Sequence, residues 1–298
     1  MKVRKGEIEI DRFVVPFRAY GEASQFIVCV NGAQQTMAAW KSVLSVFSKE
    51  YTVVLFDFPG QGRARILYGP TAISVDEQIR ILREVVSAQN ASGKVNVFGA
   101  SWGGVIVAAF ASQYPELVEK IILGSFGLKT SKKMLIVLKK GQELFENGKG
   151  DAVADLIINN FGQHLTEFYK KKIYSQFQRI KNENLRAFYL HGKLLASGQN
   201  INQVVNLCDI KAKTLIINGE FDTIMDLEDV RVASEQIPNC EARIIKGVGH
   251  FLHNERKDIL GIYKDFLSGK QERSHSTVPE ILQAHMSTST ATSKSVSP

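Results

Sequence analysis

The sequence predicts an α/β protein with a doubly wound, mostly parallel sheet and an inserted helical cap. Short, continuous apolar runs alternate with helix patterns, as expected when parallel strands are buried on both faces. One run leads through Gly-x-Ser-x-Gly at residues 99–103 into an apolar helix pattern. The alternation stops between residues 128 and 206, where only helix patterns occur. These three observations define the predicted class.

The first part of the chain supplies most of the predicted sheet. Residues 7–19 alternate around Phe13 and Phe17, which predicts an opening hairpin. Apolar runs predict strands at residues 26–30, 53–56, 95–98 and 120–123. Helices are expected at residues 37–47, 74–89 and from 105 onwards. Ser74 and Glu77 form a capping-box pattern that starts the second of these helices.

The second part of the chain divides into a cap, the rest of the sheet and a tail. We expect residues 128–206 to form the helical cap, with the α/β core made of residues 1–127 and 207–270. Strands are predicted at 214–218 and 242–245, and a last helix at 255–267. Residues 271–298 are rich in Ser and Thr and are predicted to be a disordered tail.

Composition narrows the class of protein. The chain has 298 residues, of which 44% are hydrophobic and 22% charged, as in soluble globular proteins. Its net charge of +7 comes without a nucleic-acid-binding motif. No apolar stretch approaches the ~20 residues of a membrane-spanning helix. The charged start of the chain does not resemble a signal peptide.

The three cysteines, Cys29, Cys208 and Cys240, show neither disulfide-like nor metal-like spacing. Cys29 lies in an apolar run and is predicted to be a core residue. This cysteine usage suits a reducing compartment, so we expect a cytoplasmic protein. We expect no metal and no cofactor.

Ser101 is the candidate nucleophile. A strand, a tight Gly-x-Ser-x-Gly turn and a helix would hold its hydroxyl at an exposed apex, at the positive end of the following helix. Side chains at Gly99 and Gly103 would collide with the neighbouring helix and strand. The alternative is a Gly/Ser turn without chemistry.

Asp222 is the candidate orienting acid, because a serine nucleophile needs a base and the base needs an acid. It follows the strand at 214–218, on the edge of the sheet where the sites of such proteins lie. Asp226 and Asp229 are rivals that could instead be surface charges or helix caps, and Glu220 could face solvent.

His250 is the candidate base. It follows the strand at 242–245, downstream of Asp222, after two glycines that let the loop approach the serine. His253 is predicted to be structural. The other histidines match no triad position: His164, His191, His275 and His285.

Two backbone N–H groups are candidates for an oxyanion hole. Trp102 supplies the group after the nucleophile, and Ala33 supplies one from the loop after the strand at 26–30.

With these residues the sequence resembles the α/β-hydrolase fold over roughly residues 10–268. More narrowly, it resembles the 3-hydroxyacyl transferases, which include the rhamnolipid-precursor synthase and the 3-hydroxyacyl-ACP:CoA transacylase. The shared segments are residues 30–33, 53–57, 100–104, 218–222, 228–229 and 249–252. The resemblance implies that Ser101 is the nucleophile, Asp222 the acid and His250 the base, acting on 3-hydroxyacyl thioesters through an acyl-enzyme.

Three departures leave alternatives open. Residues 58–62 read like a generic hydrolase loop, residues 221–225 differ around the acid, and the cap lacks the transacylase His-x4-Asp motif. The acyl chain, the acceptor and the choice between transferase and hydrolase therefore stay open. A second alternative is a non-catalytic ligand-binding member of the fold.

The predicted cap carries an excess of basic residues. We expect an acidic acyl carrier protein to dock on its lysines, and the alternative is a solvated helix surface. These lysines are Lys132, Lys133, Lys139, Lys140, Lys170, Lys171 and Lys172.

Overall fold

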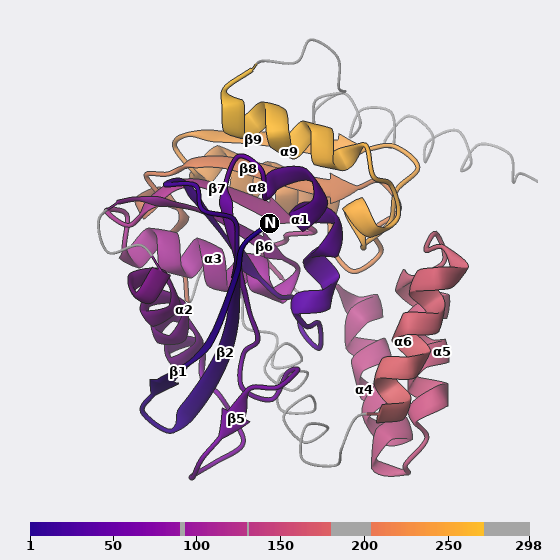
Figure 1. Cartoon of the computed structure of the whole chain (residues 1–298). Coiled ribbons are helices and arrows are strands. Elements are labelled where there is room, and N and C mark those ends of the chain that lie inside the picture. Colours follow the sequence, from indigo (N-terminus) through magenta and orange to yellow (C-terminus); the bar gives the residue numbers. More distant parts are fainter. Residues whose placement is uncertain (90–92, 130, 180–203, 271–298) are drawn as a thin grey trace, which may run out of the picture.

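The protein is built on a nine-stranded sheet in the part of the chain that the computed structural model describes, residues 1–89, 93–129, 131–179 and 204–270. The strand order is β1-β2-β4-β3-β6-β7-β8-β9, and β5 pairs with β2 (Figure 1). The strands are β1 Val3–Ile10, β2 Phe13–Tyr20, β3 Phe26–Val30, β4 Thr52–Phe56, β5 Arg65–Ile66, β6 Val95–Ala100, β7 Val118–Gly124, β8 Lys213–Gly219 and β9 Cys240–Ile245. The predicted α/β class is confirmed.

Six neighbouring strands, from β4 through β3 to β9, run parallel, so their carboxyl ends share one edge of the sheet. The opening strands β1 and β2 form the predicted antiparallel hairpin. The strand order reverses between β3 and β6, which pair directly. Loops that leave these two strands at such a switch point diverge and leave room for a ligand.

Helices cover both faces of the sheet. On one face, α2 Val75–Gln89, α3 Trp102–Gln113 and α8 Leu227–Gln236 contribute to one core cluster. On the other face, α1 Lys41–Phe47 and α9 Ile259–Ser268 contribute to a second cluster, which includes Cys29 as predicted.

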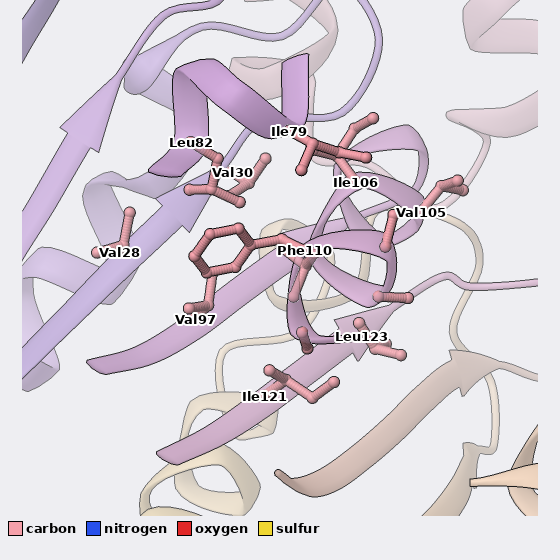
Figure 2. Packing of buried hydrophobic residues seen from close by; sticks show 14 of the residues in the cluster. Val28, Val30, Ile79, Leu82, Val97, Val105, Ile106, Phe110, Ile121 and Leu123 are labelled. Carbon is pink, nitrogen blue, oxygen red and sulfur yellow. The ribbon is translucent and has the colours of Figure 1, made fainter. Parts of the chain in front are cut away.

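The helix α3 is buried on all sides, as its apolar sequence predicts. Figure 2 shows Ile106 and Phe110 of α3 among side chains from β3, β6, β7 and α2. This packing fixes the start of α3, and with it the turn after β6.

The cap consists of three described helices, α4 Lys132–Glu146, α5 Gly150–Phe161 and α6 Glu167–Arg179. They form a group beside the sheet, drawn at the right of Figure 1. The cap contacts the core through Ile224 and Phe251, which pack with Val137 and Phe161. Ile224 follows β8 and Phe251 follows β9, so the cap packs on the two loops that carry the candidate acid and base.

Three local details refine the predictions. The capping box is present, with Ser74 N donating to Glu77 Oε2 at 2.8 Å and Glu77 N donating to Ser74 Oγ at 3.1 Å. The predicted helix at 37–47 begins as the 3-10 turn η1 Met37–Trp40. The last helix begins at Ile259, not at residue 255 as predicted, because η4 Leu252–Asn254 and a turn precede it.

Some predictions fall on residues outside the described ones: the tail at 271–298, cap residues 180–203, His191, His275 and His285. Among the described helices, none is long and apolar enough to cross a membrane.

Candidate active site

Ser101 occupies a strained turn between β6 and α3. Its φ of 53° and ψ of −121° are rarely adopted by a residue with a side chain, and such strain is commonly found at functional sites. A Cβ at Gly99 would lie 2.5 Å from Gly103 O, and one at Gly103 would lie 2.4 Å from Val30 O. Only glycine at both positions lets β6, α3 and β3 approach closely enough to hold this turn.

Asp222 and His250 form a hydrogen-bonded pair. His250 Nδ1 lies 2.8 Å from Asp222 Oδ2, and the side chain of Asp222 has no exposed surface. The other carboxylate oxygen accepts hydrogen bonds from the backbone N–H of Ile224 at 2.9 Å and of Met225 at 3.3 Å. A carboxylate held in this way favours the tautomer with the proton on Nδ1, which leaves Nε2 to accept a proton.

The loops that carry this pair lie against each other. A Cβ at Gly219 would lie 2.3 Å from the backbone oxygens of both Val248 and Gly249. Phe221 N donates to Val248 O at 2.8 Å. The segment from β8 to Asp222 therefore requires glycine where the His250 loop crosses it.

Glu255 fixes the shape of the His250 loop, a role that the sequence analysis did not identify. Its carboxylate accepts hydrogen bonds from Gly249 N at 2.6 Å and Phe251 N at 2.9 Å. Ser125 Oγ also donates to His250 O at 2.6 Å. An acidic residue five positions after the histidine was the only sequence signal for this contact.

The rival carboxylates have structural contacts of their own. Asp226 caps α8 by accepting from Glu228 N at 3.0 Å. Asp229 is buried and accepts from the backbone N–H of Leu128 and Lys129, which ties α8 to the segment entering the cap. Glu220 accepts from Gly247 N at 2.9 Å.

The other histidines lie in different surroundings. His253 is buried, stacks on Trp40 with ring centroids 5.5 Å apart, and has its pKa lowered to about 4 by burial. His164, in the cap, stacks on Phe221 with ring centroids 5.2 Å apart.

The two candidate oxyanion donors lie on the loops after β3 and β6. Ala33 follows β3, and Trp102 is the first residue of α3, where helix N–H groups point outward along the axis. Gly32 is held on both sides: its N–H donates to Gln35 Oε1 and its carbonyl accepts from Gln61 Nε2, each at 3.1 Å.

A buried network of hydrogen bonds holds the residues on either side of the Gly32–Ala33 loop. Trp40 Nε1 donates to Asn31 Oδ1 at 2.9 Å, and Asn31 Nδ2 donates to Asp57 Oδ1 at 3.1 Å. Met37 N donates to the same Asp57 oxygen at 2.8 Å. Burial raises the pKa of Asp57, against these hydrogen bonds, which lower it.

Ser101, His250 and Ala33 line one cavity, the acyl cavity hereafter, which encloses about 1030 Å³ counted out to its open mouth. The cap supplies most of the remaining wall, and its contribution is almost entirely apolar. These cap residues are Met134, Val137, Leu138, Gly141, Val153, Leu156, Ile157, Phe161, Ile173, Gln176 and Phe177. The cavity can hold an apolar chain with one end at Ser101. Among the described residues, no three His, Cys, Asp or Glu side chains are grouped as metal ligands would be.

Several known proteins are similar in sequence to this chain. The (R)-3-hydroxydecanoyl-ACP:CoA transacylase of Pseudomonas putida is 25% identical over 248 residues, covering 81% of this chain and 83% of its own. A human monoacylglycerol lipase is 24% identical over 289 residues, covering 90% of this chain and 82% of its own.

Solved structures show the same fold. An α/β hydrolase from a Medee basin deep-sea metagenome superposes with a TM-score of 0.78 at 20% identity, covering 91% of this chain and 99% of that one. A serine hydrolase from Cycloclasticus zankles gives a TM-score of 0.76 at 18% identity, covering 91% of this chain and all of that one. A family model of the α/β hydrolase fold matches residues 25–257. The chain belongs to the α/β hydrolase fold family.

Proposed function

We propose that this protein transfers acyl groups from thioesters through an acyl-enzyme on Ser101. The observation that carries the proposal is the hydrogen-bonded pair of His250 and Asp222, since His250 lines the same apolar cavity as the strained Ser101. His250 serves as the base, Asp222 orients it, and the N–H groups of Ala33 and Trp102 stabilise the oxyanion.

In the first half of the reaction, Ser101 Oγ attacks the thioester carbonyl and its proton passes to His250 Nε2. The negative charge of the tetrahedral intermediate is held by the two backbone N–H groups. The C–S bond then breaks, His250 returns the proton to the departing thiolate, and the acyl group stays on Ser101 as an ester.

In the second half, an acceptor gives its proton to His250 and attacks the acyl carbon. The bond to Ser101 Oγ breaks, and His250 returns the proton to the serine. A thiol or a hydroxyl acceptor makes the protein a transferase, and water makes it a hydrolase.

The acyl cavity and the relatives support a substrate class. The apolar wall of the cavity suits a medium or long acyl chain, since burying each CH2 group contributes about 0.8 kcal/mol. The transacylase relatives carry "(R)-3-hydroxydecanoyl" and "ACP:CoA" in their names, which supports a 3-hydroxyacyl thioester donor. The lipase relative supports a second candidate, hydrolysis of carboxylic esters.

The test is a donor and acceptor panel with the full chain. Decanoyl and 3-hydroxydecanoyl groups are offered on acyl carrier protein, on CoA and on p-nitrophenol, each with water alone or with CoA as acceptor. We expect thioester donors and CoA acceptance to dominate. Turnover of the p-nitrophenyl ester alone, with no acyl group transferred to CoA, would contradict the proposal and favour an ester hydrolase.

The Ser101→Ala variant tests the nucleophile. Loss of a nucleophile in a serine triad lowers the rate by about 10⁴-fold or more, and we expect this loss with every donor. Mass spectrometry of the wild-type protein, stopped during turnover, should show the acyl group on Ser101. An alanine variant that keeps most of its activity, or a protein never acylated, would contradict the proposal and favour a ligand-binding role.

A further inference from the structure

A second cavity adjoins the acyl cavity and has more polar residues in its wall. It encloses about 1470 Å³ counted out to its mouth, and it lies between α6, the segment from Gln34 to Ala39 and the turn at residues 60–62. We call it the polar groove. Gln34 and Gln176 line both cavities, so the polar groove shares part of its wall with the cavity that contains Ser101.

Three amide side chains that line the polar groove each have a buried polar atom without a hydrogen-bond partner. Gln34 Nε2, Gln61 Oε1 and Asn254 Oδ1 make no hydrogen bond to any described residue. Gln61 is only 4% exposed, and its Nε2 donates to Gly32 O, which directs its unmatched oxygen away from that bond. Leaving a buried polar atom without a partner is unfavourable, so these atoms indicate a ligand.

The unmatched atoms also indicate what kind of ligand would fit. One is an N–H donor and two are carbonyl acceptors. A ligand that satisfies them must itself offer both hydrogen-bond donors and acceptors. A chain of secondary amides offers both, whereas a fatty acyl chain offers neither and an ester offers only acceptors.

A cation lies on the same groove. Lys172, on α6, lies 4.3 Å from the ring centroid of Phe168 and 5.2 Å from that of Tyr169. Burial and the nearby charge of Lys41 lower its pKa, and no carboxylate contributes to the shift. Lys172 lies beside a second positive charge, and no carboxylate among the described residues offsets it, which favours an anionic group on the ligand.

We propose that the polar groove binds the phosphopantetheine arm of an acyl thioester, with its amides on Gln34, Gln61 and Asn254 and its phosphate against Lys172. This inference rests on the proposed function, because it places the thiol end of the arm towards Ser101 and the acyl chain in the acyl cavity. CoA and acyl carrier protein share this arm. The same groove can therefore bind either of them, as acyl donor or as acceptor.

Direct binding tests the groove without turnover. Calorimetry of the full chain measures the affinity for 4′-phosphopantetheine, and for pantetheine, which lacks the phosphate. Lys172→Glu should raise the Kd of 4′-phosphopantetheine about tenfold and change that of pantetheine far less, since a charge-assisted contact is lost. Lys149→Glu is the matched control, because it makes the same charge change on an exposed cap position outside the groove.

The amide contacts are tested by Asn254→Leu, with Asn254→Ala as a second variant in case the first does not fold. Each should weaken both probes by a similar factor and leave the KM for p-nitrophenyl decanoate within about twofold, because that ester has no amide arm. Thermal melting monitors folding.

The two sources of the arm are separated by adding CoA and holo-acyl carrier protein as ligands. Weaker binding of both by Lys172→Glu supports a shared groove, and an unchanged affinity for both overturns it. Failure to bind 4′-phosphopantetheine while thioesters still turn over would overturn the groove and leave the proposed function standing. Binding without thioester turnover would support the groove and remove the proposed function.

Discussion

Two histidines three residues apart, His250 and His253, have opposite surroundings. His250 lines the acyl cavity and is hydrogen-bonded to a buried carboxylate. His253 packs between the rings of Trp40 and Tyr263, and no carboxylate accounts for its pKa shift. A histidine paired with an acid can carry a positive charge during a reaction, whereas a buried unpaired one stays neutral.

We expect Asp222→Asn to lower kcat by about 10⁴-fold, because an amide neither fixes the tautomer of His250 nor stabilises its charged form. Asp226→Asn and Asp229→Asn serve as controls. Both should keep nearly normal kcat, and Asp229→Asn should instead lower the melting temperature, since Asp229 holds the entrance to the cap. Rates and melting curves of the three variants check the ranking, and a larger kcat loss at Asp229 would move the acid there.

The pKa of His253 predicts a pH dependence of stability. In the unfolded chain its pKa is about 6.5 and in the folded protein about 4, so the unfolded state binds more protons between these values. His253 thus stabilises the fold fully above pH 6.5, and this contribution is lost as the pH falls towards 4, by at most about 3 kcal/mol.

Urea unfolding of the wild type and of His253→Phe at pH 7.5, 6, 5 and 4 measures this effect. The variant keeps an aromatic ring against Trp40 but has no titrating group. Its free energy of unfolding should fall less on acidification than that of the wild type. Parallel losses in the two proteins would show that other groups cause the acid sensitivity.

At the residue scale, the order of motifs along the sequence selected Ser101, Asp222 and His250 as candidates, because each follows a strand at one edge of the sheet. The structure pairs two of them, Asp222 and His250. Contacts between distant segments could not be selected in this way. Asp229 accepts hydrogen bonds from backbone groups about a hundred positions earlier. His253 stacks on Trp40, which lies near the other end of the sequence. Nothing local in the sequence encodes either contact.

At the scale of single elements, the turn after β6 depends on two glycines. Gly99→Ala and Gly103→Ala each place a Cβ within 2.5 Å of a backbone oxygen, which cannot move as a flexible side chain would. We expect each to lower the free energy of unfolding by about 1–3 kcal/mol and to reduce activity strongly.

Gly261→Ala is the matched control, because its Cβ meets nothing within 4 Å in α9. Alanine there should stabilise the protein by about 0.5–1 kcal/mol and leave activity unchanged. Chemical denaturation and steady-state rates measure both effects. Normal activity in Gly99→Ala and Gly103→Ala would show that the backbone of the turn can shift to accommodate a Cβ atom.

The strands were predictable as elements because burial on both faces gives continuous apolar runs of the right length. Short helices and helix ends were less predictable. The helix α8 was not predicted, since its short amphipathic pattern lies among acidic residues that were weighed as catalytic candidates. The start of α9 was placed too early because Glu255 bonds back to the His250 loop instead of beginning a helix.

At the scale of the whole molecule, the basic cap bears on how a carrier protein would dock. Lys132, Lys139, Lys140 and Lys171 are exposed, whereas Lys170 pairs with Glu167 and Lys172 stacks on aromatic rings. The exposed lysines suit long-range attraction of an acidic partner, which acts on association and weakens with salt.

We expect the double variant Lys139→Glu, Lys140→Glu to lower kcat/KM for an acyl-carrier donor by about tenfold at low salt. Added salt should lower kcat/KM of the wild type and have little effect on the variant. p-Nitrophenyl decanoate serves as control, because an uncharged ester needs only the cavity. Stopped-flow and steady-state rates from 20 to 500 mM salt, about the range over which screening becomes strong, check this. Equal salt dependence for both donors would contradict a docking role and indicate that the lysines form only a solvated surface.

The cap lies within the connection from β7 to β8, two neighbouring parallel strands. Such a connection must cross from one edge of the sheet to the other whatever its length. The chain entropy lost on closing a long segment grows only with the logarithm of its length, about 0.6 kcal/mol for each doubling. The sheet therefore sets almost no limit on how large a cap this connection carries. During evolution, substrate preference can change through insertions, deletions or replacement within this one segment, while the loops after β6, β8 and β9 remain unchanged.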